Sequence, residues 1–312
     1  MTDYTAPLRD MQFILKELAG LDAVACLPGC EEASEDLVSA VLEEAGKFAA
    51  GVLAPINGQG DVQGCRLNED GSVSTPDGWQ EAYTKFAESG WIGLSLPVEY
   101  GGQGLPKLLS TAVWEMWFST NMAFTMLPQL NVGQAEALQI AATDEQKATW
   151  LTKVVSGEWA STMNLTEPQA GSDLAATRCK AEPQADGSYR LSGQKIFISY
   201  GEHELTPNIV HLVLARLPDA PAGVKGLSLF IVPKYLLDAD GNPGEANDVR
   251  CISIEHKMGI HGSPTCTMSY GDKGGALGWL VGQPNRGLEV MFIMMNEARF
   301  GVGVQGVGLG ER

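Results

Sequence analysis

The chain has 312 residues, of which 44% are hydrophobic, and this is enough for two ordinary domains with their own cores. Its net charge is −17, and residues 1–160, with 8 basic and 22 acidic side chains, contribute −14 of it. Such an acidic half repels phosphate backbones and anionic membrane surfaces, which argues against nucleic-acid binding. A well-solvated helical surface is the simplest source of the charge.

The N-terminus and the cysteines restrict the class of protein further. Residues 1–4 lack the basic start of a signal peptide, and no run approaches the roughly 18–20 apolar residues of a membrane span. Cys26 and Cys30 lie close together, but neither a second pair nor a histidine cluster completes a zinc site. We therefore expect a cytoplasmic protein with reduced thiols and no bound metal.

Apolar residues at helical spacing predict helices in the first half of the chain. Residues 7–18 form one amphipathic segment, and residues 34–52 form a second, with Ser34 as its N-cap. Residues 65–79 are polar and rich in turn formers, which predicts a surface excursion. Helical patterns resume over residues 80–88, 109–126 and 132–155.

The pattern then becomes that of strands. Residues 189–199, 209–216, 226–233, 249–256 and 265–270 are rich in Ile, Val, Leu and aromatic residues. Asp186-Gly187 and Asp240-Gly241 are turn signals beside them. A helical pattern begins again at Gly287 and runs to Arg312 without a cap or a polar tail. The segments together predict an α+β chain, and the last helix is expected to be the truncated start of a further domain.

The stretch over residues 163–173, Met-Asn-Leu-Thr-Glu-Pro-Gln-Ala-Gly-Ser-Asp, lies where the helical pattern gives way to strands. Pro168 and Gly171 stop any helix through it. Gly171 lets a ligand approach the backbone, and Thr166 and Ser172 offer hydroxyl groups. A loop of small donors can hold a flavin edge or a pyrophosphate, whereas a helix-to-strand turn with Ser and Asp caps is the alternative.

The same stretch resembles the flavin-binding signature of the acyl-CoA dehydrogenase family. Segments over residues 90–104, 144–159 and 191–199 are similar to other parts of that family, in the same order. The first helix is similar to the N-terminal extension of a bacterial subgroup that includes the 3-methylmercaptopropionyl-CoA dehydrogenases. The resemblance implies an N-terminal extension (1–35), an N-terminal helical domain (36–160), a β-barrel or sandwich domain (161–285) and the start of a C-terminal helical bundle (286–312) that is otherwise largely missing.

The resemblance also implies roles for individual residues around an FAD cofactor. Residues from the signature would lie along the flavin or meet its pyrophosphate, and Ser172 would also touch the CoA arm of the substrate. Three residues on the strand behind the flavin would complete the site, and the family often has Trp and Thr where Phe197 and Ser199 stand here. The cofactor-binding residues are thus expected to be Met163, Leu165, Thr166, Gly171, Ser172, Phe197, Ile198 and Ser199.

The substrate side of the site is less complete. Asn296 and Arg299 match family positions that contact the CoA arm, with a helix-surface pair as the alternative. The family's catalytic base is in most members a glutamate beyond residue 312, and in a minority it directly precedes the arginine that matches Arg299. Ala298 occupies that position here, and Glu297, one residue earlier, would point about 100° away. We therefore predict no catalytic residue in this chain.

Two further patterns resemble sites without the required context. Gly301–Gly306 satisfies G-x-G-x-x-G, but no clean strand precedes it and no acidic residue follows about 20 positions later, so close helix packing is preferred. The four histidines show no ligand spacing. Glu167, beside Pro168, suits a structural hydrogen bond better than a role as a base.

The resemblance implies FAD-dependent oxidation of an acyl-CoA to the trans-2-enoyl-CoA in fatty acid metabolism, with electrons passed to an electron-transfer flavoprotein. The substrate would be 3-methylmercaptopropionyl-CoA or a fatty acyl-CoA. The full-length protein is expected to be a homo-oligomer, and this chain alone is expected to be inactive. A non-catalytic binding relative and an acyl-CoA oxidase are the alternatives.

Overall fold

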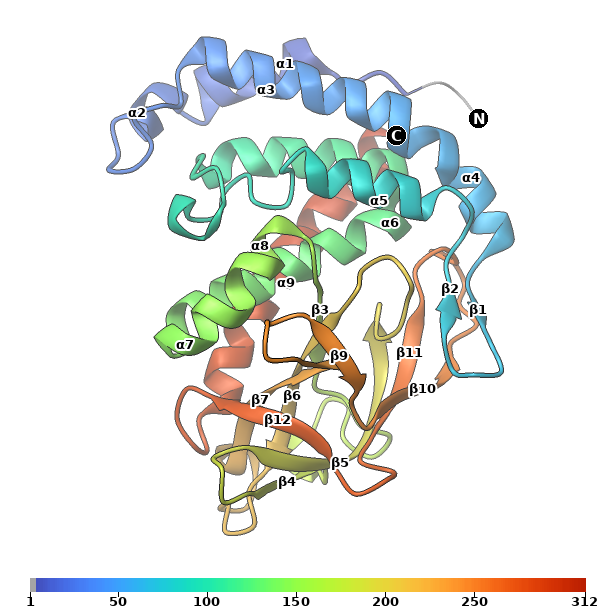
Figure 1. Cartoon of the computed structure of the whole chain (residues 1–312). Helices are drawn as coiled ribbons and strands as arrows, with labels where there is room; N and C mark the ends of the chain where they lie inside the picture. The colour runs from blue at the N-terminus through green and yellow to red at the C-terminus, as the bar shows by residue number, and fades with distance from the viewer. Residues whose placement is uncertain (1–3) are drawn as a thin grey trace.

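The computed structural model describes residues 4–312, which form a helical region and a β-rich region (Figure 1). In the view of Figure 1 the N-terminal helices lie above the strands, and the last helix, in red, passes behind α6 and continues down beside the strands. The N-terminal half contains α1 (Leu8–Phe13), α2 (Leu21–Ala25), α3 (Glu35–Phe48), α4 (Ala54–Gln63), α5 (Trp79–Glu88), α6 (Lys107–Ala141), α7 (Asp144–Gln146) and α8 (Thr152–Ser156). The predicted α+β class is confirmed.

The start of α3 follows the sequence signals closely. The Ser34 hydroxyl accepts a hydrogen bond from the backbone N–H of Leu37 at 3.3 Å, as an N-cap should. Val38, Leu42 and Ala45 then form the buried stripe of the helix. A turn of π-helix (Ala49–Leu53) carries the chain directly into α4, so the helical path extends beyond the predicted end at residue 52.

Helix α6 corrects the prediction of two helices over residues 109–126 and 132–155. It runs through residues 127–131, Pro128 included, and ends at Ala141; its kink lies earlier, at Asn121, where the backbone leaves helical geometry. The Asn121 carboxamide oxygen accepts from the N–H of Phe124 and so restarts the helix. Asn131, within this stretch, is buried and donates to the carbonyls of Val154 and Trp159 at 2.9 Å each.

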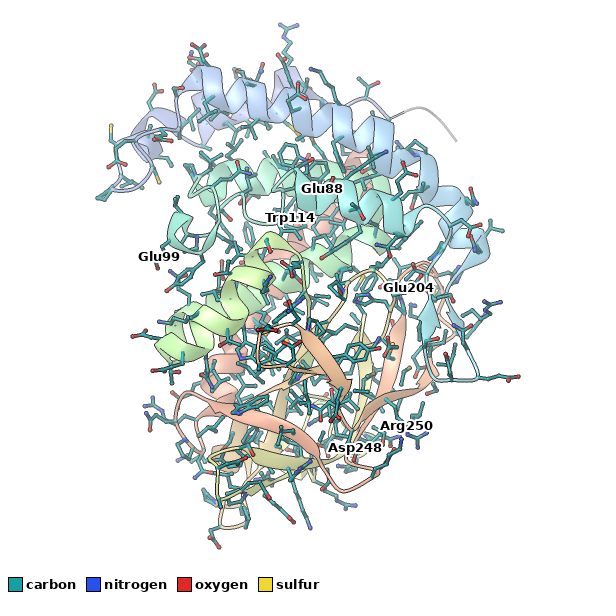
Figure 2. All side chains as sticks on the ribbon, in the orientation of Figure 1. Glu88, Glu99, Trp114, Glu204, Asp248 and Arg250 are labelled. Atoms are coloured by element: carbon teal, nitrogen blue, oxygen red, sulfur yellow. The ribbon has the colours of Figure 1, made fainter. Side chains whose placement is uncertain are left out.

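Residues 65–79 lie partly exposed at the surface, as their polarity predicted, but they contain strands that the sequence did not predict. Within this segment, β1 (Arg66–Leu67) and β2 (Val73–Ser74) form a hairpin that packs against the β-rich region. The N–H and the hydroxyl of Thr75 both donate to the Glu204 carboxylate at 2.8 Å, and Val73 is buried. Glu204 lies at this junction, near the top of the strands, in Figure 2. The polar side chains therefore bond to one another and to the second region.

The β-rich region contains one eight-stranded sheet and one two-stranded sheet. The predicted strands β5, β6 and β11 agree with the structure to the residue, β7 agrees to within one residue, and β10 ends two residues early. Five strands of this region were not predicted: β3, β4, β8, β9 and β12. The bounds are β3 (Ala160–Asn164), β4 (Lys180–Pro183), β5 (Tyr189–Ser199), β6 (Ile209–Arg216), β7 (Leu227–Pro233), β8 (Tyr235–Leu237), β9 (Pro243–Ala246), β10 (Val249–Ile254), β11 (Thr265–Tyr270) and β12 (Ala276–Val281).

The large sheet closes on itself. Strand β5 pairs with β12, β12 with β7, β7 with β6, and β4 joins β6 back to β5, which makes a small barrel. Strands β11 and β10 extend the sheet from β5, and β3 runs parallel to β6. One face of β6 and β7 packs against the helices, while Val213, Phe230 and Val232 point into the barrel. Both predicted turns are present, with Gly187 and Gly241 at φ of +86° and +82°.

The predicted helix from Gly287 is confirmed as α9 (Gly287–Glu311), which packs along α6 and touches β7. A Cβ on Gly301 would lie 1.7 Å from the side chain of Gln129 on α6, so this glycine permits close contact between the two helices. Close helix packing therefore explains Gly301, whereas a Cβ on Gly303 or Gly306 would meet nothing within 4 Å. Within residues 4–312, no helix has both the length and the apolar character that crossing a membrane requires.

Candidate functional site

The signature loop begins where β3 ends and covers residues 165–173. Leu165 is buried, Thr166 is half-buried, and Gly171 and Ser172 are exposed. Glu167 and Ala170 exchange two backbone hydrogen bonds of 3.1 and 2.9 Å, which closes a tight turn around Pro168. The loop thus presents Thr166 on one side of this turn, and Gly171 and Ser172 on the other. A Cβ on Gly171 would meet nothing within 4 Å, so the backbone there is open to an approaching group.

The end of β5 carries the second group of predicted residues and contains a β-bulge. Cys266 pairs with Ile198 and Met268 with Lys195, so Thr267 alone faces two residues of β5. Phe197 sits in this bulge with φ of +60° and is 58% exposed, which is unusual for an aromatic residue on both counts. The bulge turns the Phe197 ring outward, whereas the side chains of Lys195 and Ile198 both point inward and are buried.

A buried ion pair connects the loop to β5. The Lys195 ammonium lies 2.8 Å from Oε1 of Glu167 and donates to the Leu165 carbonyl at 3.0 Å. Burial by itself raises the pKa of Glu167, but the ammonium and the N–H groups of Arg178 and Cys179 outweigh it, so this pKa lies below its ordinary value. The Glu167 carboxylate is thus already bonded to Lys195 and to two backbone N–H groups, and its structural role stays a prediction.

A chain of buried polar side chains starts next to the loop and crosses the barrel interior. Tyr270 donates to the carboxamide oxygen of Asn164 at 2.8 Å, and Asn164 donates to the Thr162 hydroxyl at 2.7 Å. That hydroxyl shares a 2.6 Å hydrogen bond with Nδ1 of His211. Burial lowers the pKa of His211 to about 3, so the ring is neutral at neutral pH. The chain fixes the last residue of β3, from which the loop departs.

The predicted substrate-side residues lie on α9. Arg299 donates to the Asn296 carboxamide oxygen at 2.8 Å and stacks over the Phe292 ring, and both Asn296 and Arg299 are exposed. The Glu297 carboxylate is 2.6 Å from the Lys107 ammonium on α6, and burial is the main reason that its pKa is raised. The structure therefore places Glu297 against the helical region, paired with Lys107, and its exclusion as the base stays a prediction.

Sequence reasoning missed Lys195, Thr162 and Asn164. The position of Lys195 directly before the apolar run Ile196–Ile198 was the available signal, because a buried ammonium needs a carboxylate partner. Thr162 and Asn164 alternate along β3 and face the barrel interior, but β3 itself was not predicted. Residues 4–312 contain no group of three or more His, Cys, Asp or Glu side chains arranged to hold a metal ion.

Comparisons with known proteins agree with this architecture. Residues 36–158 match the acyl-CoA dehydrogenase N-terminal domain, and residues 162–272 match the acyl-CoA dehydrogenase middle domain. The chain is 50% identical over 309 residues to 3-methylmercaptopropionyl-CoA dehydrogenase of Ruegeria pomeroyi, an alignment that covers 99% of this chain and 52% of that protein. It is 37% identical over 311 residues to a broad-specificity linear acyl-CoA dehydrogenase of Mycobacterium tuberculosis, covering 98% and 51%.

A solved structure supports the same relationship. The crystal structure of an acyl-CoA dehydrogenase complexed with FAD from Bacillus anthracis superposes with a TM-score of 0.70 at 27% identity, covering 92% of this chain and 44% of that one. The chain spans about half the length of the curated relatives it matches. The two domain matches, their order and the long alignments together show that the chain belongs to the acyl-CoA dehydrogenase family of flavoprotein oxidoreductases.

Proposed function

We propose that this chain supplies the FAD-binding part of an acyl-CoA dehydrogenase. The whole protein would oxidise an acyl-CoA to the trans-2-enoyl-CoA and pass the electrons to an electron-transfer flavoprotein. One observation carries the proposal: the signature loop and the bulged end of β5 are held together by Lys195, and they carry the exposed groups expected of a flavin site. The homo-oligomeric state and the cytoplasmic location stay predictions.

The residues present fit an FAD molecule. Phe197 offers a flat, exposed aromatic face for the isoalloxazine ring, and Ser199 lies two residues further along the same strand. Thr166 offers a hydroxyl for the pyrimidine edge, while Gly171 and Ser172 offer an open backbone and a hydroxyl for the pyrophosphate. When bound, FAD supplies the acceptor for the hydride that leaves the β-carbon of the acyl group.

The chain's own contribution to the reaction is positioning. Donors at the flavin edge stabilise negative charge that builds there on reduction, because they are already oriented before the reaction starts. Asn296 and Arg299 are proposed to contact the CoA arm from α9. The base that removes the α-proton is proposed to come from the part of the whole protein that its longer relatives possess, since Glu297 is already paired with Lys107.

The choice of substrate rests on the relatives. The 50% identity to a protein named 3-methylmercaptopropionyl-CoA dehydrogenase supports that thioester as the first substrate to assay. Fatty acyl-CoAs come second, because a 37% identical relative is named for linear acyl-CoA thioesters. Turnover by the whole protein should be measured with both. If no acyl-CoA bleaches the flavin of the whole protein, the proposed activity is wrong.

The visible absorption spectrum of the purified chain tests cofactor binding directly. The chain is mixed with FAD, excess FAD is removed, and the flavin band is recorded. A retained band near one FAD per chain supports the site around Phe197, and substitution of Phe197 by Ala should weaken it. If no band remains for this chain or for the whole protein, the cofactor assignment is wrong.

A further inference from the structure

We propose that Lys195 and Glu167 are positioning residues for the cofactor: their buried ion pair fixes the signature loop in the conformation that meets FAD. This inference rests on the proposed FAD binding and adds to it the residues that set the shape of the site. Neither residue is among those expected to touch the cofactor. Their effect would come through the backbone of Leu165 and Thr166.

The hydrogen bonds around Lys195 orient the first part of the loop. Its ammonium holds the Leu165 carbonyl at 3.0 Å, and the N–H of the next residue, Ile196, donates to the Thr166 carbonyl at 2.9 Å. Both carbonyls are therefore drawn toward β5. Since a peptide unit is planar, fixing these carbonyls also fixes the direction of the N–H groups that follow them.

The Glu167 carboxylate holds the rest of the loop. Its Oε2 accepts from the Arg178 N–H at 2.7 Å and from the Gln169 side chain, and its Oε1 accepts from the Cys179 N–H at 3.1 Å. One carboxylate thus joins the turn of the loop to the segment that enters β4. These are charge-assisted hydrogen bonds, which are stronger than neutral ones.

Burial makes the arrangement rigid. Lys195 is 0% and Glu167 is 3% exposed, so an alternative loop conformation would leave one of the two charges buried without a partner. Such a charge is strongly unfavourable. The pair also connects both predicted cofactor segments, because Lys195 precedes Phe197 by two residues on the same strand. Loss of the pair should therefore change the loop and its distance from the Phe197 ring together.

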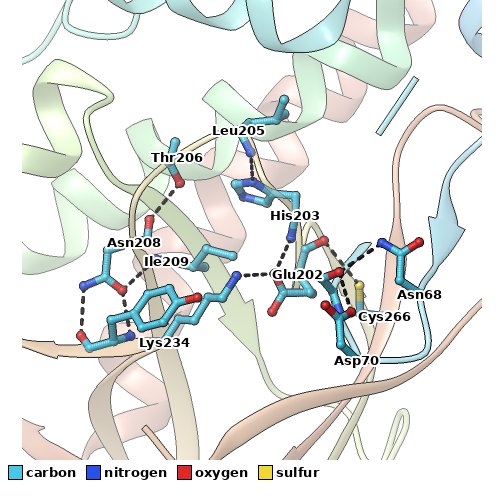
Figure 3. A network of polar contacts seen from close by, with 12 residues as sticks. Asn68, Asp70, Glu202, His203, Leu205, Thr206, Asn208, Ile209, Lys234 and Cys266 are labelled. Carbon is cyan, nitrogen blue, oxygen red and sulfur yellow. Dashed lines mark hydrogen bonds and ion pairs between the residues drawn. The ribbon is translucent and has the colours of Figure 1, made fainter. Parts of the chain in front are cut away.

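A second ion pair in the same domain provides a matched control. Lys234, which follows β7, bonds to the carboxylate of Glu202 in the segment after β5, and Figure 3 shows the two side chains meeting. Glu202 and Lys234 are largely buried, yet neither bonds to the signature loop. Substitution of Lys234 by Met therefore reports the general cost of breaking a buried ion pair in this domain.

The experiment measures the FAD dissociation constant and the urea midpoint for the full chain and three variants. Lys195→Met removes the hydrogen bond to the Leu165 carbonyl and leaves the Glu167 carboxylate without its cationic partner. The double variant Lys195→Met/Glu167→Gln leaves no unpaired charge, and the glutamine still accepts from Arg178 or Cys179. We expect about tenfold weaker FAD binding in both, since only part of the population keeps the competent loop. Lys234→Met should keep FAD affinity within about twofold of wild type.

The outcomes separate this inference from the proposed function. If wild type binds FAD and the double variant binds it equally well, the positioning role is wrong while FAD binding stands. If neither this chain nor the whole protein binds FAD, the cofactor role is wrong, and amide hydrogen exchange still tests the ion pair: the N–H groups of Arg178 and Cys179 should exchange faster in the Lys195 variants than in Lys234→Met. Equal exchange would show that the pair does not hold the loop.

Discussion

Acid should destabilise this chain through two buried histidines. Burial lowers the pKa of His203 and of His211 from 6.5 to about 3, with the Lys234 charge as a second cause in each case. Both histidines therefore bind protons near pH 6.5 in the unfolded chain but remain neutral at that pH in the folded chain. Because the unfolded state binds more protons, this stability is fully present above pH 6.5 and is lost as the pH falls toward 3.

The size of the effect follows from the two pKa values. Protonation at a pKa of 6.5 stabilises the unfolded state by about 0.2 kcal/mol at pH 7 and by about 2 kcal/mol at pH 5 for each histidine. Protonation stabilises the folded state very little at pH 5, because the folded-state pKa of each histidine, about 3, lies about two units below that pH. Lowering the pH from 7 to 5 should thus cost about 4 kcal/mol for the pair. Glu202 acts in the opposite direction, since burial raises its pKa.

Asparagine variants isolate the contribution of each histidine. In His211→Asn the carboxamide oxygen can still bond to Thr162, and in His203→Asn it can replace Nδ1, which accepts from the Leu205 N–H at 3.1 Å. Urea unfolding at pH 7 and pH 5 should show a loss of stability about 2 kcal/mol smaller in each variant than in wild type. The control variant His256→Asn changes an exposed histidine, and it should lose as much stability between pH 7 and pH 5 as wild type does. A pH dependence that is the same in all four proteins would refute the reasoning.

Two glycines of α9 and one tyrosine give further predictions, all measured by urea unfolding. Gly287→Ala should cost about 3 kcal/mol of stability, because its Cβ would lie 2.3 Å from backbone atoms of β7. Gly303 has open space around it, so Gly303→Ala should stabilise the chain by about 1 kcal/mol. Equal effects of the two substitutions would contradict the packing of α9. Tyr200→Phe should cost about 2 kcal/mol, because the buried hydroxyl donates to the Ala123 carbonyl at 2.7 Å and accepts from the Trp79 indole. A loss below about 0.5 kcal/mol would show that these two groups find other partners.

The sequence located elements best where a local signal was sufficient. Ser34 starts α3 because a hydroxyl followed by an apolar period is a local cap, and Gly187 marks a turn because it needs a positive φ. Strand β3 was missed because its residues, Ala-Ser-Thr-Met-Asn, carry little strand propensity. Its pairing comes from β6, which lies about 50 residues later in the chain. No window of local sequence contains that information.

The site shows the same division between local and distant information. The motif identified Thr166, Gly171 and Ser172 as candidate ligands, but the ion pair between Glu167 and Lys195 joins residues 28 positions apart. Strict alternation along β5 would also place Lys195 and Phe197 on one face. The bulge opposite Thr267 breaks that alternation, so one side chain is buried and the other exposed. A bulge depends on the register with a neighbouring strand, which residue spacing does not reveal.

The two strained residues near the end of β5 differ in what holds them. Tyr200 (φ +51°) is fully buried, and its contacts with Trp79 and Ala123 offset a backbone cost of about 1–2 kcal/mol. Phe197 (φ +60°) carries a similar cost, but its ring is more than half exposed and gains little from packing within the described chain. Its conformation is imposed by the bulge and by the buried Lys195 beside it. A ring held outward in this way offers a flat apolar surface, which the proposed contact with the isoalloxazine ring requires.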